Sequence, residues 1–276
     1  REQSMKKILC STGALIGRPN NRNYKLLKEI VPQLSCDGLE FMMYSTWYEE
    51  VDELVQTLRE LDVPIPVVHC QKSIGESISM GGEENFADAY RRFEINCALA
   101  EKLQAKRLVM HLWDGITSDA NFENNVQAYP RLREIAKKHG VDLLIENVVC
   151  NRISPMEHWC ELREICPDIH FIFDTKMAAF HEQLDLLYEE EYAWLWREGH
   201  ICHYHVNDYG GGFKDWKNLR TLPIGNGHID FDKFFTHIHH SGYDGTLEST
   251  AFGADGTVDI DMLNRQFAYI RKQLEE

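Results

Sequence analysis

Six short apolar segments of the sequence end in a residue of a type that binds metal ions. These residues are His69, His111, Glu146, Asp174, His205 and Glu248. Glu146 is the clearest case, because it follows the apolar residues 143–145 and would share one face of a strand with Leu144. A carboxylate buried there without a cation is costly, so the chain must supply basic groups or a metal ion.

Four of these residues come from what would be four successive strands. They are Glu146, Asp174, His205 and Glu248. Three carboxylates and one imidazole form a hard set of oxygen and nitrogen donors, which suits Mn, Zn, Co or Mg and leaves positions open for a substrate. Each of the six residues taken alone is explained as an ordinary polar residue at the end of a strand. Six strands that all end in a metal-binding residue type favour a shared site. The sequence therefore predicts one bound divalent ion.

Two further histidines would lie on the other side of Glu146. His69 and His111 either hold a second metal ion or form hydrogen bonds with substrate hydroxyls, and the sequence does not choose between these roles. His203, two residues before His205, points to the same face at a deeper position. We expect it to be a core histidine with its hydrogen bonds satisfied.

The elements that must position these residues alternate between strand and helix patterns. Strands are expected near residues 6–10, 37–43, 65–69, 108–111, 143–146, 171–174, 202–206 and 246–249, with amphipathic helical segments between them. This arrangement predicts a single-domain (β/α)8 TIM barrel, in which the carboxyl ends of the strands meet at one rim. An open doubly wound sheet is the alternative, but no glycine-rich dinucleotide fingerprint follows the first strand.

The segments that connect the strands differ in their predicted secondary structure. Residues 24–34 and 48–61 are predicted as helices, residues 71–82 as a loop because of three glycines, and residues 178–199 as one helix or two. Pro130 is expected to kink the helix before Gly140 or to mark a restart.

Composition restricts the class of protein. The chain has 276 residues and a net charge of −15, which argues against nucleic acid as a partner. Eight scattered cysteines indicate reduced thiols in a cytoplasmic protein, and no apolar run predicts a signal peptide or a membrane span. Residues 1–4 are interpreted as an expression remnant and residues 5–276 as the domain, which could form a homo-oligomer.

Several motifs occur in a fixed order along nearly the whole chain. They are Asp37-Gly38-Leu39-Glu40, residues 105–111, residues 141–147, His205-Val206-Asn207-Asp208, Ile224-Gly225-Asn226-Gly227, Gly242-Tyr243-Asp244-Gly245 and Glu248. In this order they resemble the xylose isomerase-like barrel superfamily, which contains sugar isomerases and epimerases, inosose dehydratases and the family-two apurinic endonucleases. The resemblance implies a metal-dependent enzyme with a TIM barrel fold.

The resemblance also implies roles for individual residues. The four residues assigned above to the ion correspond to the metal ligands of the superfamily, and Glu146 and Glu248 correspond to the acid/base pair of the epimerases. Arg220 is similar to an arginine that contacts substrate in some epimerases. Lys176 and Arg220 would orient substrate hydroxyls, and Trp113 would either wall the substrate site or pack a loop.

Four positions depart from the patterns of the superfamily. Met177 stands where many members have a histidine, and Leu219 and Thr221 replace the Asp and His that bind a third zinc in the endonucleases. Arg152 stands near a glutamate that the epimerases carry, which argues against a simple ketose 3-epimerase.

These observations favour an isomerase or epimerase that acts on a small sugar, keto sugar or cyclitol. A divalent ion would polarise the substrate carbonyl and stabilise an enediolate, while Glu146 and Glu248 take and return the proton. A metal-dependent dehydratase of the inosose or dehydroshikimate type would use the same groups. An endonuclease-like phosphodiesterase and a non-catalytic sugar-binding barrel are further alternatives.

Overall fold

The structure is a computed structural model that describes residues 7–238 and 243–275. The expectation for residues 1–4 lies outside these residues. Eight parallel strands form a closed barrel in the order β1 to β8, and β8 pairs with β1. The strands are β1 Lys7–Ser11, β2 Gly38–Met42, β3 Val67–His69, β4 Arg107–Met110, β5 Asp142–Glu146, β6 His170–Asp174, β7 Ile201–Val206 and β8 Asp244–Leu247. The predicted (β/α)8 TIM barrel is confirmed.

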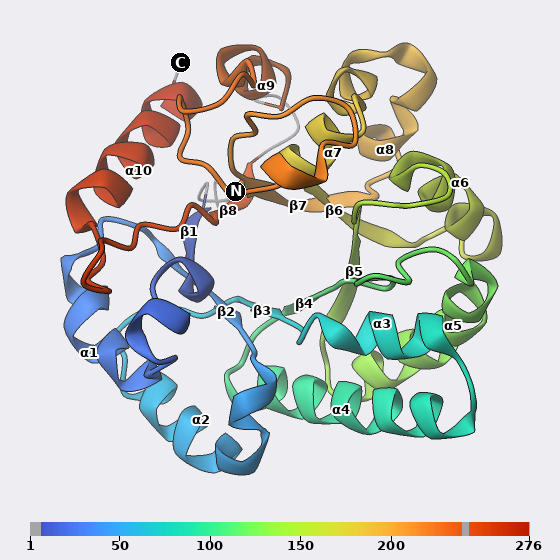
Figure 1. Ribbon diagram of the computed structural model, residues 1–276, viewed down its shortest axis with the longest axis horizontal. Helices are drawn as coiled ribbons and strands as arrows, with labels where there is room; N and C mark the ends of the chain where they lie inside the picture. Colours follow the sequence, from blue (N-terminus) through green and yellow to red (C-terminus); the bar gives the residue numbers. More distant parts are fainter. Residues whose placement is uncertain (1–6, 239–242, 276) are drawn as a thin grey trace, which may run out of the picture.

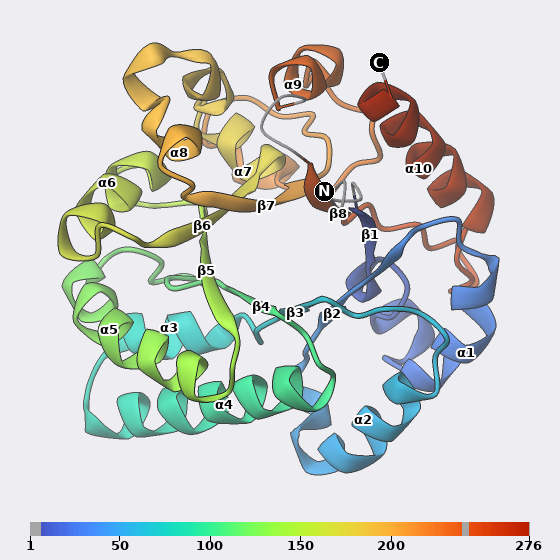
Figure 2. The ribbon, with the colours of Figure 1, turned by 180° about the vertical axis from the view of Figure 1, so that it is seen from behind.

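Helices surround the barrel on all sides, as the two opposite views show (Figures 1 and 2). They are α1 Leu27–Ile30, α2 Val51–Arg59, α3 Ser73–Met80, α4 Glu83–Lys102, α5 Phe122–Lys138, α6 Pro155–Ile165, α7 Thr175–Phe180, α8 Trp194–Arg197, α9 Phe231–Ile238 and α10 Ile260–Glu275. None of the helices in the described part of the chain has the length and apolar character that a membrane span requires.

Alternation along the strands separates the barrel interior from the layer under the helices. Leu9, Val67, Val109, Leu144 and Ile172 form a small apolar cluster of their own inside the barrel. Their neighbours along the strands pack outward in the main core, where Trp159 of α6 stacks on Phe171 at 4.2 Å. Since side chains two residues apart share a face, Glu146 lies inside with Leu144, as predicted.

Five connecting segments differ from the sequence predictions. Residues 73–80, predicted as loop, form helix α3, which buries Ile74 and Ile78. Gly75 there is needed for space, because a Cβ at this position would lie 2.1 Å from the carbonyl oxygen of His111. Pro130 lies inside the continuous helix α5, so the predicted restart is wrong.

The other differences are helices that break into short pieces. Residues 24–34 give only α1, between 3-10 helices at Tyr24–Leu26 and Val31–Gln33. Residues 178–199 give neither one long helix nor two, but the end of α7, 3-10 helices at Leu184–Tyr188 and Glu190–Tyr192, and α8. The segment 48–61 begins as a 3-10 helix, Ser45–Glu50, before α2. Two further 3-10 helices span Thr12–Ala14 and Arg18–Asn20, and another spans Trp216–Asn218.

Candidate functional site

Four side chains meet at the carboxyl ends of strands β5 to β8. Glu146 and Asp174 are the last residues of β5 and β6, His205 is the penultimate residue of β7, and Glu248 directly follows β8. The His205 Nδ1 atom lies 2.9 Å from Glu146 Oε1, 3.4 Å from Glu248 Oε1 and 3.8 Å from Asp174 Oδ2. The structure thus brings together the four residues that the sequence assigns to a metal ion; that they bind one stays a prediction.

The inner atoms of this cluster have no hydrogen-bond partner among the residues that the structure describes. They are Glu146 Oε1, Asp174 Oδ2 and His205 Nδ1. All three residues are at most 1% exposed, and three of their donor atoms lie within 4.8 Å of one another. Buried oxygens and nitrogens are rarely left unpaired, because each costs free energy. A divalent ion would satisfy all three atoms, and the donor set suits Zn, Mn or Co.

Burial and neighbouring charges separate the pKa values of the two glutamates. Burial raises the pKa of Glu146, but the imidazoles of His205 and His111 lower it by more, so that it lies well below the usual range. Burial raises the pKa of Glu248 to about 7, with Asp174 and Glu146 adding to the effect and His205 opposing it. One carboxylate is therefore held ionised while the other can carry a proton near neutral pH.

Two asparagines hold the carboxylates in place. The side chain of Asn147 accepts a hydrogen bond from Asp174 N at 2.7 Å and donates one to Asp174 O at 3.1 Å. Asp174 Oδ1 caps helix α7 by accepting from Met177 N at 2.9 Å, which leaves Oδ2 for the cluster. Asn207 Nδ2 donates to Glu248 Oε1 at 2.8 Å. The roles of these asparagines were not predicted from the sequence, although each follows a predicted ligand within two residues.

His69 and His111 lie against Glu146, as expected. His111 contacts two carboxylates, with Nε2 3.1 Å from Glu146 Oε2 and Nδ1 2.9 Å from Asp114 Oδ1. Burial lowers its pKa, but these carboxylates raise it to about 9. His69 Nδ1 donates to the Cys70 carbonyl at 2.8 Å, while its Nε2 lies 3.7 Å from Glu146 Oε1 without a hydrogen bond. His111 is thus arranged as a hydrogen-bond donor, yet the group could also hold a second ion.

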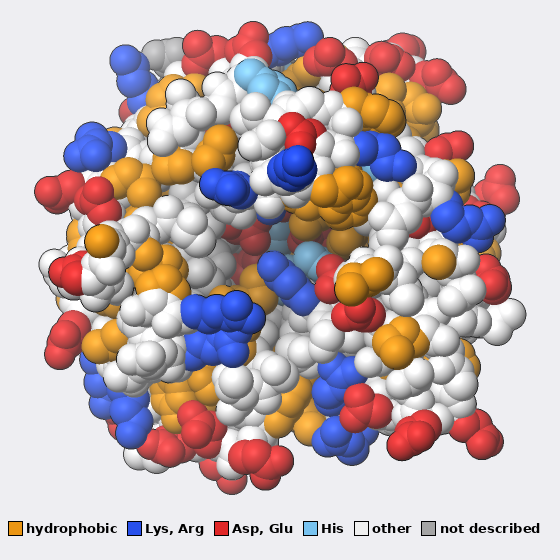
Figure 3. Space-filling view, in the orientation of Figure 1, with side chains coloured by type: hydrophobic (Ala, Val, Ile, Leu, Met, Phe, Trp, Pro, Cys, Tyr) orange, Lys and Arg blue, Asp and Glu red, His pale blue; other side chains and the backbone are white. Residues whose placement is uncertain are grey.

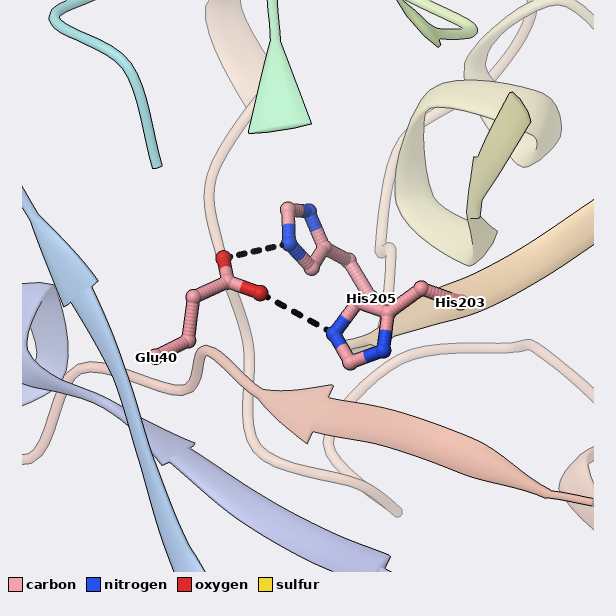
Figure 4. A group of neighbouring side chains, drawn as sticks. All are labelled: Glu40, His203 and His205. Carbon is pink, nitrogen blue, oxygen red and sulfur yellow. Dashed lines mark hydrogen bonds and ion pairs between the residues drawn. The ribbon is translucent and has the colours of Figure 1, made fainter. Parts of the chain in front are cut away.

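A buried glutamate, Glu40, whose role the sequence does not predict, lies beneath the cluster. Figure 4 shows the carboxylate of Glu40 between the rings of His203 and His205. His203 also contacts Thr246 Oγ1 at 2.8 Å and Asp244 Oδ1 at 3.1 Å, which confirms its prediction as a satisfied core histidine. The available signal was a charged residue in the middle of an otherwise apolar strand, β2.

The three residues predicted to contact substrate differ in their burial and in their hydrogen bonds. Lys176, at the start of α7, donates to Thr221 Oγ1 at 3.1 Å and thereby ties the loop after β7 to the site. Arg220 lies on the same loop and is exposed. Trp113 is fully buried, and its Nε1 donates to the Val148 carbonyl at 3.1 Å. Trp113 therefore packs a loop, which is one of the two roles predicted for it, and it does not line the substrate site in this structure.

Lys72 is a cation near the site that the sequence analysis did not identify. Desolvation acts to lower its pKa, but the carboxylates of Glu248 and Glu146 raise it by more. In the space-filling view this face of the barrel is hollowed at its centre, with acidic and histidine side chains inside and Lys and Arg side chains around the opening (Figure 3). Such an opening suits a small polar ligand with oxygens to bind.

Asp119, another buried carboxylate, shapes the loop that follows β5. Its oxygens accept hydrogen bonds from the backbone N–H groups of Asn151, Arg152 and Ile153 at 2.7–3.2 Å and contact His158 Nε2 at 2.9 Å. Arg152 itself is exposed, so no side chain there replaces the glutamate of the epimerases inside the site. Asp119 thus fixes the loop that leads away from Glu146.

Replacing Asp119 with asparagine should lower the free energy of unfolding by about 2–3 kcal/mol, because the amide nitrogen cannot accept from the loop N–H groups. Burial raises the pKa of Asp119, but its His158 and backbone contacts lower it by more, so this stability is present above the unfolded pKa and is lost as the pH falls. Urea unfolding measures the loss. Asp168→Asn, at an exposed ion pair with Arg133, should cost less than about 1 kcal/mol, and equal losses would contradict the assignment.

Solved structures with the same architecture cover nearly the whole chain. A D-tagatose 3-epimerase-like protein matches with a TM-score of 0.68 and 20% identity, over 98% of this chain and 97% of its own. D-allulose 3-epimerase from Methylomonas sp. in complex with D-allulose gives 0.68 and 14%, over 97% of each chain. The IOLI protein with a binding zinc atom gives 0.70 and 15%, over 97% and 99%. At these identities, the likeness shows the fold alone.

Comparison of sequences gives the family directly. No curated protein sequence matches the chain. A family profile described as xylose isomerase-like TIM barrel matches residues 29–272, which is most of the chain and includes all four residues of the candidate metal cluster. The chain therefore belongs to the xylose isomerase-like TIM barrel family.

Proposed function

We propose that the protein is a divalent-metal-dependent isomerase or epimerase of a small sugar, keto sugar or cyclitol. The observation that carries the proposal is the cluster of Glu146, Asp174, His205 and Glu248 at the rim. In the described part of the chain, one atom of each of the first three has no hydrogen-bond partner. The related folds add support, since solved examples include epimerases of D-tagatose and D-allulose type and a protein with bound zinc. The polar side chains in the hollow of this face would suit a small polyol with a carbonyl group.

The four residues of the cluster would hold the ion, and a second ion could bind between His69, His111 and Glu146. When bound, a divalent ion acts as a Lewis acid on neighbouring substrate oxygens and makes the adjacent C–H group more acidic. The barrel surroundings are buried, which strengthens the electrostatic effect of every charge in the site.

Glu248 and Glu146 would transfer the proton. Glu248 is the more accessible of the two, with its side chain 14% exposed, which suits a group that takes a proton from substrate and returns it. Glu146 is ionised and lies on the other side of His205. An epimerase needs one group on each face of the carbon, and an isomerase needs one group that serves two neighbouring carbons, so both reactions are compatible with this pair.

Three cationic or donating groups would orient the substrate. His111 can donate from Nε2, and Lys72 and Lys176 carry positive charges close to the carboxylates. Their hydrogen bonds would fix the hydroxyl groups on either side of the reacting carbon, which places that carbon near Glu248.

The test begins with protein freed of metal and reloaded separately with Mn²⁺, Zn²⁺, Co²⁺ or Mg²⁺. Ketoses, inososes and dehydroshikimate-like compounds are then incubated with it in D2O. We expect deuterium to enter the carbon next to a carbonyl only in the metal-loaded protein, and a chelator to lower the rate at least about tenfold.

Other outcomes would redirect the proposal. Loss of water from the substrate would indicate the dehydratase, and cleavage of abasic DNA would indicate the endonuclease-like activity. Sugar binding without exchange or turnover would indicate a binding barrel, and a protein that binds no divalent ion would contradict the proposal altogether.

A further inference from the structure

Glu40 is a fully buried carboxylate that lies inside the barrel, directly behind His205 (Figure 4). Its Oε2 atom is 2.6 Å from His205 Nε2. Glu40 is on β2 and His205 on β7, which are not neighbours in the barrel, so the contact crosses the interior. We infer that Glu40 is a positioning residue, which sets the orientation and the protonated nitrogen of His205 for metal binding. The inference rests on the proposed function.

The direction of this hydrogen bond decides which nitrogen of His205 is available. An ionised carboxylate only accepts hydrogen bonds, so the proton lies on Nε2 and is donated to Glu40. In the neutral ring, Nδ1 then carries the lone pair. This is the atom that faces Glu146, Asp174 and Glu248. A carboxylate behind a metal-bound imidazole fixes the ring and increases its basicity, which is a common arrangement at metal sites.

Glu40 is itself held from the side opposite His205. Its Oε1 atom accepts from His203 Nε2 and from Thr246 Oγ1, each at 3.0 Å. His203 in turn reaches Asp244 Oδ1 at 3.1 Å, and Asp244 Oδ2 is 2.6 Å from Arg107 Nη1. The hydrogen-bonded chain runs from the candidate metal cluster through the barrel interior to its amino-terminal end. These contacts restrict the Glu40 carboxylate to few positions, so its hydrogen bond to His205 has a fixed direction.

A metal ion held by Glu40, His203 and His205 themselves is a different reading of the same group. Both carboxylate oxygens of Glu40 are already engaged by N–H and O–H donors, so such an ion would have to displace every one of these hydrogen bonds. The cluster at the rim has unpaired atoms instead. The geometry favours Glu40 as a hydrogen-bond acceptor behind the ligand.

The test measures the affinity of metal-free folded protein for Zn²⁺ and Mn²⁺ by competition with a chelator. Glu40→Leu removes the acceptor and should weaken binding about a hundredfold, while Glu40→Gln keeps one acceptor oxygen and should weaken it about tenfold. Thr246→Val is the matched control: it removes a hydrogen bond to Glu40 but leaves the contact with His205, and should change the affinity less than about threefold. The visible spectrum of cobalt-loaded protein should change in both Glu40 variants.

Urea unfolding of the metal-free variants separates positioning from packing. The inference is overturned if Glu40→Gln and Glu40→Leu bind both ions as tightly as the wild type and lose only stability. If Glu40→Leu does not fold, the affinity of Glu40→Gln decides the matter by the same criterion. Wild-type protein that binds neither ion would instead contradict the proposed function, and this inference would fall with it.

Discussion

Replacing Glu146 with glutamine is expected to lower turnover by at least about a thousandfold at saturating metal and substrate. Glu146 lies 2.9 Å from His205 Nδ1 and contacts His111 with its other oxygen, so one substitution removes a ligand and a proton-transfer group. The neutral amide cannot take up the proton, and its NH2 group would face a cation or the imidazoles. Initial rates and deuterium exchange, measured with the substrate that the panel identifies, give the size of the loss.

The matched control is Glu164→Gln, at an exposed glutamate of α6. It makes the same chemical change on the outer layer and should leave turnover within about twofold of the wild type, because exposed substitutions rarely disturb a site. Metal content must be measured for both variants, since Glu146→Gln should also bind the ion less tightly. Wild-type turnover in Glu146→Gln would remove Glu146 from the mechanism and with it the acid/base pair.

The pattern at the strand ends was enough to predict the centre of this site. Side chains two residues apart on a strand share a face, so the position of Leu144 sets the face of Glu146, and the position of Ile172 sets the face of Asp174. Barrel closure then brings the ends of β5 to β8 together without further information from the sequence. The ligand positions depend only on local alternation and on topology, and both can be read from one sequence.

Glu40 could not be found in this way, because its partners lie across the barrel. The contact of Glu40 with His205 joins residues 165 positions apart, and no local period links them. The same limit applied to Trp113, where the residue type suggested a ring against a sugar but full burial under a loop decided its role. Asn147 likewise depends on the neighbouring strand, since it supports Asp174 on β6.

The predicted helices differ from the structure for two physical reasons. Glycine is typical of loops, but Gly75 lies in α3 because its backbone packs closely on the chain after β4. A helical composition alone does not set the length of a helix. In residues 178–199, helical residue types form only short elements, which are the end of α7, two 3-10 helices and α8. Local propensity is a weak guide that tertiary context overrides.

The affinity for a divalent ion should depend steeply on pH, and this is the second large effect expected. The pKa of Glu248 is raised to about 7 by burial, and burial lowers the pKa of His205 but Glu248 and Glu40 raise it well above its ordinary value. In metal-free protein below pH 7, both groups hold protons that an ion must displace. Each displaced proton changes the affinity about tenfold per pH unit, so lowering the pH from 7 to 5 should weaken binding by about a thousandfold or more.

Calorimetry with Mn²⁺ in buffers of different ionisation enthalpy would count the protons released, with circular dichroism to verify that the protein stays folded at each pH. We expect close to two protons at pH 6 and close to one at pH 8, where Glu248 has lost its proton but His205 has not. Glu248→Gln should bind more weakly and release about one proton fewer at pH 6, because the glutamine amide has no proton to lose in this range. An affinity that stays constant from pH 5 to 8, with no proton release, would show that the ion does not bind at His205 and Glu248.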